Sequence, residues 1–430
     1  MTEQGSECTQ TERRVLDAID EDQIGADLVA LVGFPSIDGT AAEAEVQAWC
    51  AERLRTLGMA VDHWLTDVRD LADDPAYPGM EVERTGVWGC VGRTGRADRE
   101  EAPALVLNGH VDVVPAGDLD LWPDRAPFTA RLAEGSWWGR GTCDMKGGVA
   151  AILGAVNALS QAGVQLTRPL AVHTVTGEED GGIGTFATLR RGHVGEACVI
   201  AEPTDGAIVP ANAGSLTFRI TVAGLATHGS TRTRGVSAVE KFERVHEALR
   251  RLEAERNADL PDLFAHLDVG WPLSVGQVNA GDWASTVPDR LIAQGRYGVM
   301  PGESVQDAKA ALDIAVAQAC RADPWLRTHP ALVEWPGGHY ASGSLPEGHP
   351  LLDDVAAAVR AVGGPRPDVL GGPYGSDLRQ YAMAGVPTLQ YGPGQAVFAH
   401  AVDEHVSVDE VVRCARAYAV LALRLCGGQA

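Results

Sequence analysis

The sequence offers its first candidate for chemistry where a short apolar segment ends in an imidazole and a carboxylate. Residues 104–107 are followed at once by Asn-Gly, and then by His110 and Asp112 two positions apart. An apolar run that stops at Asn-Gly predicts a buried strand, and ligands of open α/β sheets collect beyond the carboxyl ends of such strands. His110 and Asp112 could both bind a metal ion, or one could bind it while the other orients its partner. Alone, a His-x-Asp pair is more typical of a polar strand end.

Imidazole and carboxylate groups follow other apolar segments as well. They are Glu178 and Glu179 after residues 170–176, Glu202 after residues 197–201, and His400 after residues 386–391 and a glycine-rich loop. Asp144 lies at a loop-to-helix junction, where capping of the helix is the alternative role. The alternative for the two adjacent glutamates is a solvated acidic turn. Because all these predicted strand ends deliver the same two kinds of group, a shared metal site is favoured over unrelated surface residues.

The chemistry that such a set of groups could perform is hydrolysis at divalent metal ions. Imidazole and carboxylate ligands without thiolate favour Zn²⁺, with Co²⁺ as the other candidate. Five ligands are too many for one tetrahedral ion with an open position, whereas two ions that share a bridging carboxylate would use them all. Adjacent residues of a loop point in different directions, so one of Glu178 and Glu179 could bind metal while the other accepts the proton of the attacking water.

The elements that must position these residues form an α/β pattern with an interruption. Residues 213–336 contain predicted strands at 216–222, 273–278, 290–299 and 332–335 and helices at 236–255 and 303–320. This β-α-β-β-α-β order predicts a compact α+β insert of the ferredoxin-like type with its own sheet. None of the strand-end groups falls within it. We therefore expect a discontinuous catalytic metal-binding domain with a mixed sheet, residues 1–212 plus 337–430.

Helical periodicity in the expected catalytic domain covers residues 11–31, 41–57, 147–162 and 351–362. A last helix is predicted to begin after Ser407, where Ser407 and Glu410 have the spacing of a capping box. Further strands are expected at residues 59–64 and 87–91.

Composition narrows the class of protein. The 430 residues carry 35 basic and 58 acidic side chains, a net charge of −23, which argues against nucleic acid or an anionic membrane surface as partner. No apolar segment is long enough to span a membrane, and the first eight residues lack the features of a signal peptide. Eight cysteines without Cys-x-x-Cys pairs are typical of reduced thiols. We expect a cytoplasmic protein.

Taken together, the motifs resemble those of the dizinc aminoacylase/carboxypeptidase family of metallopeptidases, which includes acetylornithine deacetylase and succinyl-diaminopimelate desuccinylase. The resemblance runs through nearly the whole chain. The matching motifs are Gly-His110-Val-Asp112, Trp122 with Pro127-Phe128, Gly139-Arg-Gly-Thr-Cys-Asp144-Met-Lys-Gly-Gly, Thr176-Gly-Glu178-Glu179, Glu202-Pro-Thr, Ala226-Thr-His228-Gly-Ser, and His400 with Asp403-Glu404.

The resemblance implies a role for each residue. His110 and Glu202 would bind one zinc ion, Glu179 and His400 the other, and Asp144 would bridge the two. Asp112 would orient His110, and Glu178 would be the general base and acid. His228, from the insert, would reach the oxyanion of the substrate, often in the site of the partner subunit; without the resemblance an ordinary strand-end histidine would be the better interpretation. The insert would then be a lid and dimerisation domain, and the protein a homodimer.

The sequence departs from the family pattern where the insert usually meets the substrate carboxylate. An asparagine is common shortly before the Val-Pro of the insert, and an arginine three residues before the Pro-Gly-Glu. This chain has Ser285 (or Thr286) and Gly298 at those places, with Arg296 nearby. The departures leave the identity of the substrate open.

The function expected from the sequence is hydrolytic removal of the acyl group from an N-acyl amino acid or related amine. Water held between the two ions would attack the amide carbonyl, with Glu178 as its base. A carboxypeptidase or dipeptidase on the same scaffold is the first alternative. A metal-binding protein without catalysis is a remote one, because every catalytic role has a candidate residue.

Overall fold

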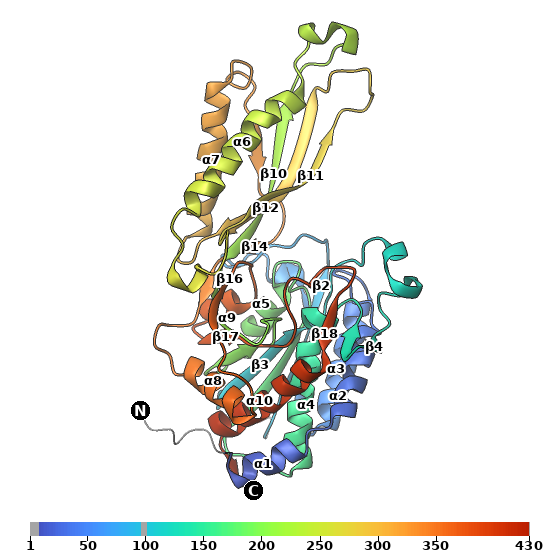
Figure 1. Cartoon of the computed structure of the whole chain (residues 1–430), viewed down its shortest axis with the longest axis vertical. Coiled ribbons are helices and arrows are strands. Elements are labelled where there is room, and N and C mark those ends of the chain that lie inside the picture. The colour runs from blue at the N-terminus through green and yellow to red at the C-terminus, as the bar shows by residue number, and fades with distance from the viewer. Residues whose placement is uncertain (1–7, 96–100, 430) are drawn as a thin grey trace.

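The computed structural model describes residues 8–95 and 101–429 and places them in two lobes, one built around a large sheet and the other around a smaller one (Figure 1). Residues 1–7, on which the expectation about a signal peptide rests, lie outside the described residues. Within the described ranges, no helix combines the length and the apolar character that crossing a membrane requires.

The larger lobe contains a nine-stranded mixed sheet in the order β1-β2-β7-β3-β8-β17-β9-β15, with β16 paired to β9. Its strands are β1 (Ala60–Asp67), β2 (Gly86–Arg93), β3 (Leu105–His110), β7 (Leu170–Val175), β8 (Cys198–Ile200), β9 (Ile208–Asn212), β15 (Gly343–Ser344), β16 (Val369–Gly372) and β17 (Thr388–Gln390). The central strands β7, β3, β8 and β17 are parallel. Their carboxyl ends therefore meet at one edge of the sheet, where the sequence places its candidate ligands. The predicted α/β fold class is confirmed.

Helices cover both faces of this sheet. Cys90 and Val87 of β2 point to opposite faces, because side chains alternate along a strand. Cys90 belongs to a large apolar core and Val87 to a smaller one with Ile183 and Phe186 of α5 (Ile183–Arg190). The large core contains Leu189 of α5 and residues of α1 (Gln10–Asp17), α2 (Glu21–Val32), α3 (Ala42–Thr56), α4 (Gly147–Gln161), α8 (Leu351–Ala361), α9 (Leu378–Met383) and α10 (Val408–Cys426).

Two local predictions about these helices are wrong. Residues 11–31 form α1 and α2 instead of one helix, because the Asp20 carboxylate accepts a hydrogen bond from the backbone N–H of Gln23, at 2.9 Å, and starts a new helix. The Ser407 side chain makes no capping hydrogen bond to α10. Instead of completing a capping box, the Glu410 carboxylate accepts from the backbone N–H of Gly394.

The smaller lobe contains the sheet order β11-β12-β10-β13, with β14 also paired to β10. Its elements are β10 (Gly214–Ala223), α6 (Ala238–Arg256), β11 (Leu273–Ala280), β12 (Arg290–Val299), α7 (Val305–Ala322), β13 (Leu332–Glu334) and β14 (His339–Tyr340). All pairings are antiparallel, in the order of a ferredoxin-like fold. Both helices pack on one face of this sheet (Figure 1).

Short strands complete the larger lobe. They are β4 (Arg131–Ala133), β5 (Ser136–Trp138) and β18 (His405–Ser407) in one sheet, and β6 (Gln165–Leu166) and β19 (Gly428–Gln429) in another.

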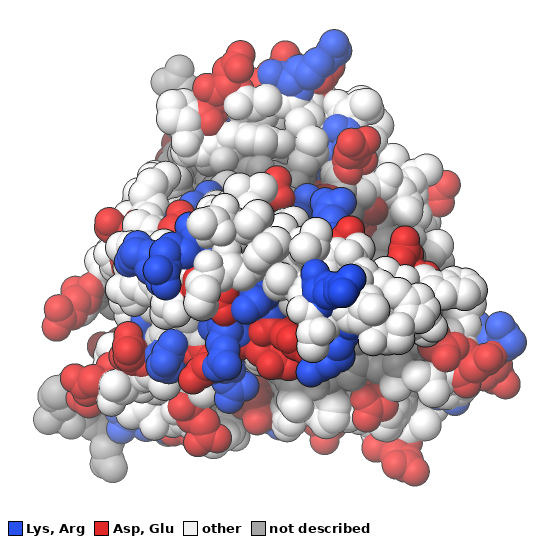
Figure 2. All heavy atoms as spheres, turned by 90° about the horizontal axis from the view of Figure 1, so that it is seen from above, with Lys and Arg blue, Asp and Glu red and all other residues white. Residues whose placement is uncertain are grey.

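Seen from the end of the smaller lobe, basic and acidic side chains are interspersed over the surface (Figure 2).

Candidate metal centre

His110 is the last residue of β3, and its imidazole is buried between several carboxylates. Its Nδ1 lies 3.1 Å from the backbone carbonyl oxygen of Asp112. Because a carbonyl oxygen only accepts, Nδ1 must be the donor, and this leaves Nε2 as the ligand atom of the neutral ring. Nε2 lies 3.0 Å from Asp144 Oδ1 and 4.0 Å from Glu202 Oε2.

Asp112 lies where it can orient two of the other residues. Its backbone carbonyl fixes the ring of His110, whereas its carboxylate Oδ1 is 3.8 Å from Nδ1 of that ring. The other carboxylate oxygen accepts a hydrogen bond of 3.1 Å from the backbone N–H of Glu179. Asp112 thus contacts the histidine at the end of β3 and the glutamate after β7 at the same time.

Asp144 stands between the two candidate metal-binding histidines. Its Oδ1 lies 3.0 Å from His110 Nε2, and its Oδ2 lies 3.5 Å from His400 Nε2. The alternative role as a helix cap is not seen, because the N-cap of α4 is Lys146 and no side chain caps this helix. A carboxylate that offers one oxygen to each side has the arrangement that a bridging ligand needs.

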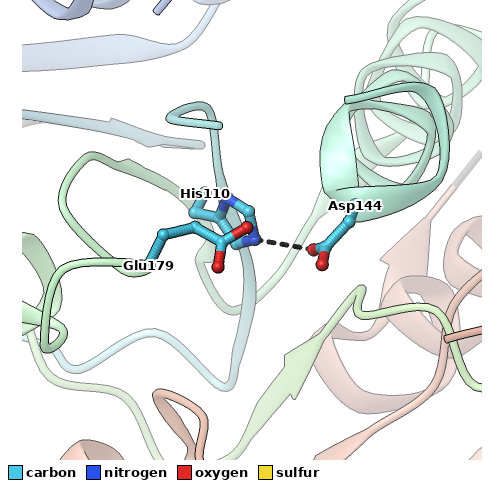
Figure 3. Close-up of side chains that lie close together, drawn as sticks. All are labelled: His110, Asp144 and Glu179. Atoms are coloured by element: carbon cyan, nitrogen blue, oxygen red, sulfur yellow. Dashed lines mark hydrogen bonds and ion pairs between the residues drawn. The ribbon is translucent and has the colours of Figure 1, made fainter. Parts of the chain in front are cut away.

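Glu179 completes the group around Asp144. Its Oε1 lies 2.9 Å from His400 Nε2, and its carboxylate faces the His110 ring, as Figure 3 shows. Possible ligand atoms of His110, Asp144 and Glu179 lie within 4.8 Å of one another, and the same holds for His110, Glu178 and Glu202. Residues from four separate strand or loop ends therefore meet at the carboxyl edge of the sheet.

Glu178 differs from Glu179 because, among the described residues, its carboxylate makes no hydrogen bond or ion pair. Its side chain is buried, and its Oε1 makes no hydrogen bond within the described part of the chain. Burial, followed by the negative charges of Asp377 and Glu202, raises the pKa of Glu178 well above its ordinary value. A buried carboxyl group that is not held by a donor is suited to take up and release a proton.

The pKa shifts reflect an excess of negative charge. Burial and the charge of Asp144 raise the pKa values of Glu179 and Glu202. Burial alone would lower the pKa of His400, but its hydrogen bonds to Asp144 and Glu179 raise that pKa to about 11. Carboxylates that repel one another in a buried site, with imidazoles beside them, are the donor set that divalent cations stabilise.

A buried ion pair supports the loop of Asp144 from behind. Glu404 Oε1 accepts from the backbone N–H groups of Cys143 and Asp144, at 3.0 and 3.1 Å, and Oε2 lies 2.5 Å from Arg140 Nη1. Both side chains of the pair are almost fully buried. Glu404 belongs to one of the family motifs but had no role assigned from the sequence. In the structure its carboxylate holds the backbone of Cys143 and Asp144.

The cleft in front of these residues has a volume of about 380 Å³ and is bounded by both lobes. The larger lobe contributes Asp144, Glu178, Glu179, Glu202, Pro203, Pro373, Tyr374, Gly375, Ala396, Ala399 and His400, and the smaller lobe contributes Pro272 and Arg296. Tyr374 was missed in the sequence, where its only signal is the glycine-rich stretch around it.

His228 is the one predicted site residue that lies apart from the others. It is exposed, it follows the far end of β10, and its Nδ1 lies 2.7 Å from Ser230 Oγ. The start of β10 adjoins the larger lobe, and a ten-residue strand spans roughly 30 Å. Ser285 and Thr286 adjoin the His228 segment through a bond from Gly229 N to Ser285 O and a bridge between His228 and Thr286.

Most of the chain, including the residues of this cleft, matches a known protein family. The family model described as Peptidase family M20/M25/M40 matches residues 106–424. The chain belongs to this family. It is therefore a metal-dependent hydrolase that acts on amide C–N bonds, and the resemblance stated from the motifs is confirmed.

Individual relatives agree with this assignment. A succinyl-diaminopimelate desuccinylase from Gluconacetobacter diazotrophicus is 33% identical over 385 residues, which cover 83% of this chain and 88% of the relative. An N-formyl-4-amino-5-aminomethyl-2-methylpyrimidine deformylase from Halalkalibacterium halodurans is 28% identical and covers 89% and 90%. A di-peptidase from Saccharomyces cerevisiae shares the fold, with a TM-score of 0.77, 15% identity and coverage of 96% and 98%.

Proposed function

We propose that the protein is a dinuclear metal deacylase that hydrolyses the amide bond of an N-acyl amino acid or a related N-acyl amine. The observation that supports this most strongly is the arrangement around Asp144. Its two carboxylate oxygens face His110 and His400, and the buried Glu178 lies in the same cleft without a hydrogen-bond partner for Oε1 among the described residues.

The residues present fit two divalent ions, Zn²⁺ first and Co²⁺ second. His110 and Glu202 would hold one ion, Glu179 and His400 the other, and Asp144 would contribute to both. When bound, the ions would lower the pKa of a water molecule and polarise the carbonyl group that it attacks. Asp112 would keep the ring of His110 and the backbone of Glu179 in place through the contacts described above.

Glu178 would perform the proton transfers. Its carboxylate accepts a proton from the attacking water, and the resulting carboxylic acid returns that proton to the nitrogen of the leaving amine. The raised pKa of Glu178 follows from burial and from nearby negative charge. A carboxylic acid with a raised pKa retains its proton against water and passes it to a stronger base such as the leaving amine nitrogen.

Arg296 would select substrates that carry a carboxylate. It lines the cleft from β12, and its guanidinium donates to Ser215 Oγ at 2.7 Å and to the Pro373 carbonyl at 3.0 Å. Among the described residues it makes no ion pair with a carboxylate, and an arginine remains charged in such a site. The family position at Gly298 could not hold an arginine here, because a Cβ atom there would lie 2.8 Å from the Trp271 Cα.

Replacing Arg296 by alanine is expected to raise KM for substrates with a free carboxylate by about 30-fold, a loss of about 2 kcal/mol. KM for matched amides without that carboxylate should change little. Initial-rate measurements on both kinds of substrate test this. Arg219→Ala is the matched control, because Arg219 lies in the neighbouring strand β10 and its guanidinium donates to Gln294 Oε1. An equal rise in KM for both kinds of substrate would contradict the role given to Arg296.

A homodimer would complete the site. His228 lies at the far end of the smaller lobe, so we propose that it serves the cleft of a second subunit, where its imidazole would face the oxyanion. β11 supports the proposal as an edge strand of its sheet, with most of its residues exposed and with Trp283 72% exposed beyond it. Such an edge can pair with a second copy of itself about a two-fold axis.

One lobe would carry out catalysis, and the other would cover the cleft and form the dimer contact. Residues 1–212 and 337–430 would form the catalytic metal-binding domain, and residues 213–336 the lid and dimerisation domain. The short strand β14 follows this boundary and adds to the sheet of the second domain. The expected absence of a nucleic-acid or membrane partner rests on the net charge of −23. The expected cytoplasmic location rests on the eight cysteines without Cys-x-x-Cys pairs.

A substrate screen tests the deacylase proposal against the dipeptidase alternative. The metal-loaded enzyme would be assayed on N-acetyl, N-succinyl and N-formyl amino acids, including derivatives of ornithine and diaminopimelate, and on dipeptides of the same residues. We expect kcat/KM to be at least about tenfold higher for one of the N-acyl series than for any dipeptide. Faster hydrolysis of the dipeptides would instead assign the cleft to peptide substrates.

A further inference from the structure

One side chain joins the sheet of the smaller lobe directly to the loop of the proposed base. The hydroxyl of Tyr340 donates a hydrogen bond to the backbone carbonyl of Glu178 and accepts one from the backbone N–H of Gly181, at 2.7 Å. Burial raises the pKa of Tyr340 well above its usual value, so the hydroxyl keeps the proton that it donates. The two bonds fix both sides of the turn that follows Glu178.

Tyr340 itself belongs to β14, which pairs with β10 of the smaller lobe. Ser215 is the partner of Tyr340 in that pairing, and Leu216 is the partner of His339. The next residue of β10, Thr217, donates from its Oγ1 to Glu81 Oε1 at 2.5 Å. The Glu81 and Val82 backbone N–H groups in turn donate to the Asp180 carboxylate. The sheet of the smaller lobe thus reaches the loop 178–182 by two routes.

The packing around these bonds leaves little freedom. The Arg379 guanidinium lies 4.0 Å from the centre of the Tyr340 ring, is fully buried, and donates to the carbonyl of Gly181. A Cβ atom at Gly375 would lie 2.5 Å from the Tyr340 Cβ, and one at Gly338 would lie 2.8 Å from the Gly181 Cα. A shift of β14 is therefore transmitted to the loop and cannot be absorbed by a gap.

The position of the Glu178 carboxylate depends on these contacts of the loop. Because its Oε1 has no hydrogen-bond partner among the described residues, the place of the carboxylate depends on the backbone that carries it. A displacement of about 1 Å at a reacting group can cost about 10²-fold in rate.

We propose that Tyr340 is a positioning residue for Glu178 and couples the orientation of the smaller lobe to the place of the general base. The inference deepens the proposed function and rests on the role that it gives to Glu178. When β14 moves with its sheet, the hydroxyl of Tyr340 carries the Glu178 carbonyl with it. The base is then aligned only in the lobe arrangement in which Arg296, on the same sheet, also lines the cleft.

The first test is Tyr340→Phe in the metal-loaded, full-length protein. Phenylalanine keeps the ring over Arg379 and removes only the hydroxyl. We expect kcat to fall about 10- to 100-fold, as for other residues that orient a catalytic group, with KM within about twofold and the bound metal unchanged. An unchanged kcat would overturn the proposal, and so would a loss of bound metal that accounts for the fall.

Tyr418→Phe is the matched control. Tyr418 is buried, and its hydroxyl also donates to a backbone carbonyl, that of Tyr391, within the core around α10. Tyr418→Phe removes the same kind of bond, and among the described residues the Tyr418 hydroxyl makes no hydrogen bond to the loop 178–182. We expect a comparable loss of unfolding free energy and a kcat within about twofold of wild type. If the control lowers kcat as much as Tyr340→Phe does, the effect is general destabilisation and the proposal fails.

A double-mutant cycle with Glu178→Gln separates a positioning role from a merely structural one. If Tyr340 acts through Glu178, then Tyr340→Phe should lower the residual rate of the Glu178→Gln enzyme by less than about twofold. An equal fall in both backgrounds would overturn the coupling. If Glu178→Gln alone left kcat intact, the proposed base would be wrong and the function proposal would fail first, which is a distinct result.

Discussion

Glu178→Gln is expected to reduce kcat by about 10²–10⁴-fold, the range that general acid–base groups contribute. Glutamine retains the size of the side chain but cannot take the proton of the attacking water or return it to the leaving nitrogen. Both ions should stay bound, because the proposed ligands His110, Asp144, Glu179, Glu202 and His400 remain. Steady-state kinetics and metal analysis on the same preparation make the measurement.

Glu12→Gln provides the control for this substitution. Glu12 is also a buried glutamate, but it pairs with Arg424 and caps α1 far from the cleft. Its replacement should lower stability while kcat stays close to wild type. Full turnover by Glu178→Gln with metals bound would show that another group carries the proton.

Asp144→Asn is expected to have an effect of similar or greater size, through the metal ions. The amide keeps the shape of the side chain but removes the charge that faces His110 on one side and His400 on the other. We expect the bound metal to fall from about two ions per chain to one or fewer. kcat/KM should fall by at least about 10³-fold, because metal ions contribute several kcal/mol to the transition state of such reactions.

Asp62→Asn is the control that separates the loss of bound metal from the loss of an ordinary ion pair between an aspartate and a histidine. Asp62 lies 2.9 Å from His193 Nε2 and also pairs with Arg191 at the surface. Asp62→Asn should leave both the metal content and kcat/KM unchanged. Two ions retained by Asp144→Asn would contradict the bridging position.

Several candidate site residues stand out in the sequence because each follows an abrupt local change. His110, Glu178 and Glu202 follow apolar segments directly, and parallel strands bring such ends to one edge of a sheet. The ferredoxin-like lobe was predicted for a similar reason, since its strands and helices each carry a clear hydrophobic period. The partition of the residues into ligands and a base came from the resemblance to a family and not from periodicity.

Residues that act on a distant backbone could not be predicted. Tyr340 binds the carbonyl of a residue 162 positions away, and Glu404 binds N–H groups 261 and 260 positions away. Neither contact leaves a local pattern, because any side chain with a hydroxyl or carboxylate looks the same in sequence. The break between α1 and α2 was missed for the opposite reason: the capping effect of Asp20 is local, but the apolar period continues through it.

Metal removal and replacement tests the central claim most directly. The protein would be stripped with a chelator, titrated with Zn²⁺ or Co²⁺, and assayed at each step on the best N-acyl substrate of the screen. We predict that the metal-free protein has no measurable amide hydrolysis and that activity returns as about two ions bind per chain. Hydrolysis at the full rate by the metal-free protein would contradict a metal-dependent deacylase built around Asp144.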